Sequence, residues 1–237
     1  MKNNTQCSTF NSQLQKGWEY GTLADAVNKG SSNISLNKVK DDDGKYKLFS
    51  AKGYNKNISF FHQEKEYLAI IKDGAGIGRV SKHPAKSSVV ATMQYLIPKE
   101  GFNIGFIQYF LNGIDFESHR QGSTIPHVYF KDYKLEPFPL LPLPQQKQIV
   151  AILDKAFAAL DTAKSNAEQN LQNAKELFEI SFPKTIKEQE KVVQNINTLK
   201  AETKKLESIY TQKIADLEEM KKSVLQKAFS GQLNIKN

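Results

Sequence analysis

The chain has 237 residues, 39% of them hydrophobic, and a mean hydropathy of −0.52. That length suits one large domain or two small ones, and no apolar run approaches the ~20 residues that a membrane span needs. The N-terminal stretch Met1–Gln15 is polar and unlike a signal peptide, and the single cysteine, Cys7, excludes a disulfide framework within one chain. We therefore expect a cytoplasmic protein with a modest core.

Positive charge is concentrated in the first part of the chain. The formal net charge is +8; residues 1–140 carry 18 Lys and Arg against 13 Asp and Glu, and residues 141–237 carry 15 against 12. Such an excess favours a polyanionic partner such as nucleic acid. Solubility alone is the alternative explanation of the charge.

Residues 1–16 are expected to form a flexible leader, and residues 17–140 an irregular α+β domain. Trp18–Val27 opens this domain as a strand or short helix, and residues 28–45 are polar with turn signals. Phe102–Leu111 has aromatic residues at helical spacing and predicts a helix, and Ile125–Phe138 is expected to be extended. Short apolar or alternating runs predict strands at Tyr46–Phe49, Ile58–Phe61, Tyr67–Ile71, Ile77–Ser81, Val89–Ala91 and Met93–Ile97.

Residues 141–237 predict two long helices joined by a short break. The two prolines of Leu140–Pro144 indicate a stiff connection before the first helix, which is expected at about residues 145–181 and would be ~55 Å long. Residues 181–184 contain a proline that breaks this helix, and the second is expected at about residues 186–229, with Gly231 as its stop. Only about five residues separate the helices, so we expect them to pair antiparallel.

The two predicted helices carry the same apolar pattern. Gln146–Val150 recurs as Gln189–Val193, 43 residues later, and the apolar residues of both copies follow a heptad spacing interrupted by one four-residue step. In the first helix the predicted seam passes through Ala163. Matching seams predict a coiled-coil-like spacer that also docks partner proteins, and the residues assigned to it are Ile149, Leu153, Leu160, Leu171, Val192, Ile196, Leu199, Leu206 and Leu217.

No motif for catalysis, metal binding or a cofactor is found. Gly74–Gly78 lacks the third glycine of a dinucleotide fingerprint because Arg79 stands there, so a glycine-rich turn between strands is the better interpretation. The four histidines lack metal-ligand spacing. Neither a nucleophile–base pairing nor the Asn/Asp/Ser-Pro-Pro-Tyr/Phe motif that an amino-methyltransferase needs is visible. We therefore expect a non-catalytic chain that itself binds neither metal nor cofactor.

Basic, aromatic and hydroxyl side chains gather in the predicted loops of the first domain. Such side chains reach the phosphates and base edges of DNA. Each of them alone is more simply explained as a solubilising surface residue, but their clustering around one sheet favours a nucleic-acid interface. The candidate DNA-binding residues are Lys52, Tyr54, Lys72, Arg79, Lys82, His83, Lys86, His119, Arg120, Ser123 and Thr124.

Four segments, in this order, resemble the DNA-specificity subunit of type I restriction–modification systems. They are Gly17–Leu23, Gly122–Pro126 (Gly-Ser-Thr-Ile-Pro), Pro142–Asp154 and Leu225–Leu233. Members of that family usually carry two target-recognition domains, each followed by a conserved helix. This chain has one such domain before both helices and is similar to a half subunit.

The resemblance implies a division of labour. The recognition domain would read one half-site of double-stranded DNA, and the helices would be a spacer and a docking surface for modification subunits, which bring S-adenosylmethionine and methylate adenine at N6. It also leaves room for a translocating restriction subunit. A second copy of this chain is expected to supply the other half-site in a homodimer. Two alternatives stay open: a structural coiled-coil adaptor, and a decayed specificity subunit without DNA-reading activity.

Overall fold

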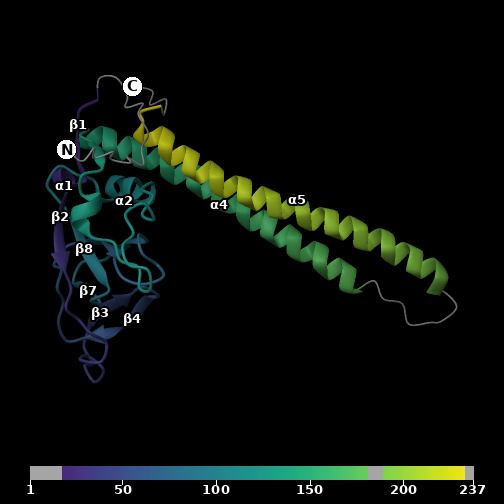
Figure 1. The fold of residues 1–237 in the computed structure, drawn as a ribbon, viewed down its shortest axis with the longest axis horizontal. Coiled ribbons are helices and arrows are strands. Elements are labelled where there is room, and N and C mark those ends of the chain that lie inside the picture. The colour runs from purple at the N-terminus through teal and green to yellow at the C-terminus, as the bar shows by residue number, and fades with distance from the viewer. Residues whose placement is uncertain (1–17, 181–188, 233–237) are drawn as a thin grey trace. The chain divides into compact units, whose positions relative to one another are not determined.

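The computed structural model describes residues 18–180 and 189–232, without the side chains of residues 174, 177–180 and 189–199. The predicted leader at residues 1–16 and the predicted break at 181–184 lie outside the described residues. The chain divides into two compact units, a head domain of residues 18–151 with 225–232 and a helical arm of residues 152–224 (Figure 1). No described helix has the length and apolar character needed to cross a membrane.

The head domain is α+β, as predicted, and its strands form three small sheets. β1 pairs with β9, the order β2-β8-β5-β6 makes a four-stranded sheet, and the order β4-β3-β7 makes a three-stranded one. In chain order the elements of the molecule are β1 (Tyr20–Thr22), α1 (Leu23–Ala26), β2 (Val27–Ser31), β3 (Tyr46–Ser50), β4 (Gly53–Ile58), β5 (Tyr67–Ile71), β6 (Val80–His83), β7 (Ser87–Val89), β8 (Met93–Pro98), α2 (Ile104–Asn112), α3 (Phe130–Tyr133), β9 (Pro137–Pro139), α4 (Leu143–Ile180) and α5 (Gln189–Phe229).

β5 lies at the centre of the head-domain core. All five of its residues are buried, and it pairs antiparallel with β8 on one side and β6 on the other. An unbroken apolar run of this length is typical of a strand that is covered on both faces. Leu48 of β3 and Ile58 of β4 belong to the same buried cluster as Tyr67 and Tyr95, so the core joins the two larger sheets.

The strand predictions hold for β3, β5 and β8. The predicted strands Ile77–Ser81 and Val89–Ala91 overlap β6 and β7 only in part, and the prediction fails at β4. β4 covers Gly53–Ile58 rather than Ile58–Phe61, because its hairpin with β3 exposes its first three residues to water and leaves no apolar alternation to detect. The segment 125–138 is not continuously extended. It contains the short helix α3, whose Tyr133 is fully buried.

Each of the long helices has one end inside the head domain. In the first turn of α4 the buried Gln146 side chain accepts a hydrogen bond from the Asn103 N–H (2.7 Å) and donates one to the Gly101 carbonyl (3.1 Å). At the end of α5, Phe229 is 1% exposed and its ring lies 5.2 Å from that of Phe106 in α2. The segment before α2 and the start of α4 are thereby joined to each other, and the end of α5 is joined to α2.

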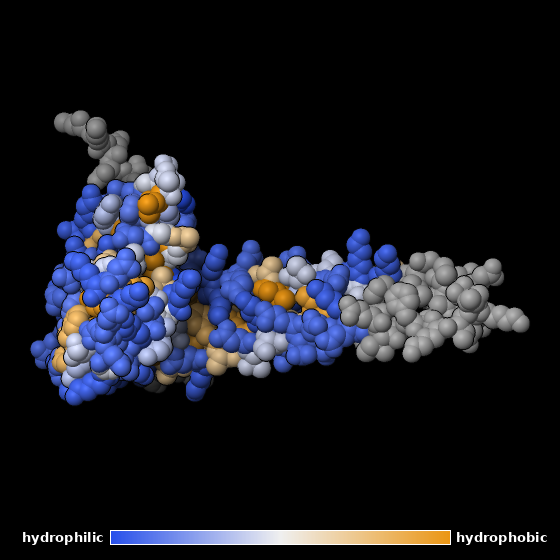
Figure 2. Space-filling view, turned by 90° about the horizontal axis from the view of Figure 1, so that it is seen from below, coloured by the Kyte–Doolittle hydropathy of each residue, from blue (hydrophilic) through white to orange (hydrophobic). Residues whose placement is uncertain are grey.

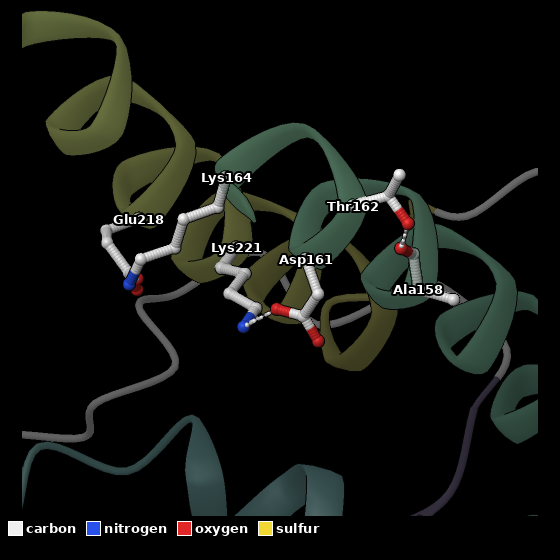
Figure 3. A network of polar contacts seen from close by, with 6 residues as sticks. All are labelled: Ala158, Asp161, Thr162, Lys164, Glu218 and Lys221. Carbon is white, nitrogen blue, oxygen red and sulfur yellow. Dashed lines mark hydrogen bonds and ion pairs between the residues drawn. The ribbon is translucent and has the colours of Figure 1, made fainter. Parts of the chain in front are cut away.

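Ion pairs show that α4 and α5 run antiparallel in the arm, as predicted. Lys221 Nζ lies 2.6 Å from Asp161 Oδ1, and Lys164 donates a hydrogen bond to Glu218 (Figure 3). Three residues forward from Asp161 to Lys164 on α4 correspond to three residues backward from Lys221 to Glu218 on α5. The hydrogen bond raises the pKa of Lys164 and lowers that of Glu218, so both side chains keep their charges near neutral pH.

The seam of the arm deviates from its predicted path. In α4, Leu160 and Ala167 are buried and Lys164 is partly buried between them, whereas Ala163 is exposed. The four-residue step therefore falls between Leu160 and Lys164, because a lysine can lie along the seam with its stem while its ammonium group reaches a partner. In α5, Leu206 is 41% exposed, contrary to its predicted place in the seam.

The other predicted seam positions differ in burial. Ile149, in the head domain, and Leu153, in the arm, are both fully buried, and Leu171 and Leu217 are partly buried. The description does not include the side chains of Val192, Ile196 and Leu199.

Candidate nucleic-acid interface

Three loops that are far apart in the sequence meet on the head domain. The Arg79 guanidinium group donates a hydrogen bond to the Ala51 carbonyl in the turn between β3 and β4. The Gly74 N–H donates to the Pro126 carbonyl (2.9 Å), so the turn after β5 also contacts the loop between α2 and α3. We call residues 51–54, 72–79 and 119–131 together the three-loop surface.

The glycine-rich turn after β5 packs closely against the α2–α3 loop. Gly78 has a φ of +81°, and a Cβ atom there would lie 2.4 Å from the Cβ of Phe116 in the α2–α3 loop. Gly74 has a φ of +97° with open space around it, so its requirement is one of backbone conformation alone. The turn is therefore shaped to lie against the α2–α3 loop, in keeping with the prediction of a turn between strands.

An aspartate–histidine contact joins two of the loops. His127 Nδ1 lies 2.7 Å from Asp73 Oδ1, and Lys72 Nζ lies 2.6 Å from Asp73 Oδ2. Burial alone would raise the pKa of Asp73, but the hydrogen bonds from Lys72 and His127 outweigh it and lower the pKa, so the carboxylate stays charged. The His127 ring stacks on that of Tyr129 at 6.0 Å, and Tyr129 is 42% exposed.

Besides His119, whose side chain is directed toward Glu136, seven of the eleven candidate DNA-binding residues lie on the three-loop surface with their side chains exposed or partly exposed. Tyr54 and Ile125 are the most exposed large hydrophobic side chains of this surface, at 58% each. Arg120 forms an ion pair with Glu117 (3.2 Å) that is largely open to solvent. The seven residues are Lys52, Tyr54, Lys72, Arg79, Arg120, Ser123 and Thr124.

His83 is a core residue and not a surface contact, contrary to the prediction. It is 5% exposed, its ring stacks on Tyr67 at 5.3 Å and contacts Phe49 at 4.6 Å, and its Nε2 lies 2.8 Å from the Ser81 hydroxyl. Burial lowers its pKa to about 4, so the ring is neutral near pH 7. The register of β6 against β5 turns this side chain inward, which a loop assignment could not reveal.

Three further candidates are paired within the protein and lie away from the three-loop surface or point into the fold. Lys82 and Lys86 lie near the start of β5, the end opposite to Lys72, where they approach Glu66 (3.1 Å) and Glu64 (3.5 Å). His119 is at the loop itself, but its Nε2 lies 2.8 Å from the buried carboxylate of Glu136. Lys82 and Lys86 thus have acidic partners, as Arg120 on the three-loop surface does, and the His119 side chain is directed toward Glu136.

Five residues that characterise the surface were not predicted: Asp73, Ile125, His127, Tyr129 and Lys131. Asp73 and His127 are 54 positions apart, and nothing in either segment indicates their contact. Exposed Tyr129 and Ile125 lie in a segment that was interpreted as a strand, where apolar residues are expected to be buried. The sequence indicates the loop through His119, Arg120, Ser123, Thr124 and the Gly-Ser-Thr-Ile-Pro segment, but not the placement of these five residues.

The described residues hold no group of three or more His, Cys, Asp or Glu side chains that could bind a metal ion. What they do hold is an α+β head with basic and aromatic loops, carried by two long antiparallel helices. The family described as "Type I restriction modification DNA specificity domain" matches residues 15–173. The chain belongs to this family, and the matched residues include the whole three-loop surface.

Solved structures with low sequence identity are also similar to the chain. The type I restriction-modification S subunit from M. genitalium is 16% identical over 73% of this chain and 47% of its own, with a TM-score of 0.49. The HsdS subunit from Thermoanaerobacter tengcongensis is 17% identical over 94% of this chain and 47% of its own, with a TM-score of 0.46. The chain spans about half the length of these proteins. No curated protein matches its sequence.

Proposed function

We propose that the chain is the sequence-reading subunit of a type I adenine-N6 methyltransferase and that the three-loop surface contacts its DNA target. The observation that carries this proposal is the meeting of three distant loops on the head domain of a chain from a DNA-specificity family. Sites that read DNA combine cations for phosphates with polar and apolar side chains for base edges. The three-loop surface offers both kinds of side chain.

The charge of this surface suits a polyanion. Its acidic residue Asp73 is already bound by Lys72 and His127, so it repels a phosphate only weakly. The surface carries four exposed cations, of which Arg120 is paired with Glu117, and exposed aromatic rings lie beside them. Lys131 is 5.6 Å from the Tyr129 ring. The cations in question are Lys52, Arg79, Arg120 and Lys131.

The chemistry in this proposal belongs to other subunits. S-adenosylmethionine would bind to modification subunits, and those subunits would dock on the arm. The arm has a groove of about 440 Å³ whose lining includes Ala167, Tyr210, Leu217 and Met220. Figure 2 shows hydrophobic side chains on the arm between hydrophilic ones. Apolar surface of this kind on a helix pair is what a partner helix can cover.

A charge-removal experiment tests the DNA surface. In the chain assembled with its methyltransferase, the triple variant Lys52→Gln, Arg120→Gln, Lys131→Gln should bind target DNA more weakly. Each lost phosphate contact should reduce the log–log salt slope by ~0.9. The matched control is Lys38→Gln, Lys82→Gln, Lys86→Gln, which removes the same charge from other parts of the head domain. Anisotropy titrations at several salt concentrations measure both. Equal losses in the two variants would place the DNA elsewhere.

Two further readouts separate the proposal from a purely structural adaptor. Sequencing of methylated adenines in a host with and without residues 1–140 of this chain should show a sequence motif that depends on them; an adaptor would leave the motif unchanged. Purified chain with DNA and labelled S-adenosylmethionine should transfer no methyl group. Transfer without a second polypeptide would refute the non-catalytic assignment.

A further inference from the structure

The tip of the α2–α3 loop is braced from within. Gln121 and His127 exchange two backbone hydrogen bonds of 2.8 Å each, which close residues 122–126 into a tight loop. Gly122 has a φ of +80°, and a Cβ atom there would lie 2.5 Å from the Ile125 carbonyl oxygen. The loop sequence therefore specifies one backbone shape, and few other residues could replace Gly122 without changing it.

The same loop is braced from outside by its neighbours. The Pro126 carbonyl accepts from Gly74, and the Val128 N–H donates to the Lys72 carbonyl (2.9 Å). The Gln121 amide group donates to Asp132 Oδ2 (2.7 Å), and Asp73 holds His127. These bonds hold the chain on both sides of the tip, at Gln121 before it and at residues 126–128 after it. Much of the conformational entropy of ordering the loop is therefore already lost in the free protein.

One large apolar side chain lies at this braced tip and is exposed. Ile125 has 58% of its surface open to solvent, and Gly122, Ser123 and Thr124 beside it are exposed as well. A β-branched apolar residue in this position contributes little to the core, because burial is what makes such a side chain stabilising. A rigid loop that presents an apolar side chain between two hydroxyl groups and a proline is suited to contact another molecule.

We propose that Ile125 is a specificity-determining residue that contacts the 5-methyl group of a thymine in the major groove. This rests on the proposed function. The methyl group is the apolar feature that distinguishes thymine at the major-groove edge, and Ser and Thr hydroxyls can bond to neighbouring base edges. The cations Arg79 and Arg120 lie on the same surface, where they would hold the adjoining phosphates.

The test removes the methyl group from the DNA and the side chain from the protein. After methylated-adenine sequencing has defined the target, each thymine of a target duplex is replaced singly by deoxyuridine. Wild-type chain, assembled with its methyltransferase, should lose about fourfold in affinity at one position, the effect of one buried methyl group. The Ile125→Ala variant should bind the thymine duplex more weakly and show no further loss with deoxyuridine at that position.

Matched variants and outcomes keep the inference separate from the proposed function. Ile125→Val should retain most of the thymine preference, and Leu36→Ala, which truncates a 41%-exposed leucine elsewhere on the head domain, should behave as wild type. Unchanged affinity of Ile125→Ala, or a loss that is equal for thymine and deoxyuridine at every position, would overturn the inference. Absence of any sequence-specific binding by the wild-type assembly would instead overturn the proposed function.

Discussion

His83 and His127 show how the surroundings of a side chain decide its role. Both rings stack on a tyrosine. His83 does so at the end of a strand inside the core, where its nearest polar partner is the Ser81 hydroxyl. His127 does so on the three-loop surface, where the charged Asp73 holds one ring nitrogen and a third of the side chain stays open to solvent. Of the two histidines, His127 is the one whose side chain is open to solvent.

The buried His83 should make the protein less stable in mild acid. Its pKa falls from 6.5 to about 4 on folding because burial disfavours the imidazolium form. Between those values the unfolded chain binds a proton that the folded chain does not, so the free energy of unfolding decreases as the pH falls. The loss by pH 4 is on the order of 3 kcal/mol, from ~1.36 kcal/mol per pKa unit.

Urea denaturation of the full chain at several pH values between 7 and 4 measures this loss. The His83→Phe variant is the matched control, because phenylalanine keeps a ring between Tyr67 and Phe49 but cannot be protonated. The decrease in unfolding free energy should be smaller in the variant than in the wild type. An identical pH dependence of the two proteins would show that His83 is accessible to protons in the folded state.

Sequence reasoning found the loops of the surface but could not decide every side chain in them. The residues that bind DNA and the residues that solubilise or fill a core have the same chemical types. Lys52 and Arg79 differ from Lys82 and Lys86 only in their neighbours, since Glu64 and Glu66 precede β5 and face the latter pair. Such pairings arise from strand register, which the sequence alone does not specify.

At the scale of the elements, the predicted and observed seams of the arm differ in which residue of α4 follows Leu160, Ala163 or Lys164. Ala163 and Lys164 both allow a heptad path in α4, because a step of three or of four residues stays on one face of a helix. The side chains decide between them: Lys164 lies between Leu160 and Ala167 and reaches Glu218 on α5. The helices and their antiparallel pairing were predictable, but the position of the four-residue step was not.

Two leucines of the predicted seam should therefore differ strongly when they are replaced by a charge. Leu153 is fully buried and Leu206 is 41% exposed. Leu153→Asp should cost ~2–5 kcal/mol, the range for the loss of a buried leucine. Leu206→Asp should change stability by less than about 1 kcal/mol, as is usual for surface positions. Chemical denaturation of the full-length variants measures both values, and equal costs would mean that Leu206 is covered in solution.

At the scale of the whole molecule, the start of α4 and the end of α5 belong to the same domain. Phe229 packs on α2, although almost the full length of α4 and α5 separates it in sequence from the rest of the head domain. The sequence indicated only a helix stop near Gly231, because a single apolar residue at a helix end carries no information about its distant partner. Because of this packing, the head domain holds both the start of α4 and the end of α5, and the residues between α4 and α5 are limited to 181–188.

This arrangement bears on how a bipartite target would be read. The described residues contain one sheet-rich head domain, and residues 181–188 lie between α4 and α5. We propose that two copies act together, so that each head reads one half-site. A two-fold pair presents identical readers, and its target is then an interrupted palindrome. α4 has 38 residues, or ~57 Å at 1.5 Å per residue. That length exceeds one DNA turn of ~34–36 Å, so the helices are long enough to separate the half-sites.

Sequencing of methylated adenines in a host that carries this chain as its only specificity protein tests the pairing. A symmetric motif of two identical half-sites with a fixed gap is expected, because both readers are the same polypeptide. The solution mass of the isolated chain is a weaker test, since the methyltransferase can be what brings the two copies together. An asymmetric two-part motif that depends on this chain alone would exclude the two-fold pair, because two identical readers cannot recognise two different half-sites.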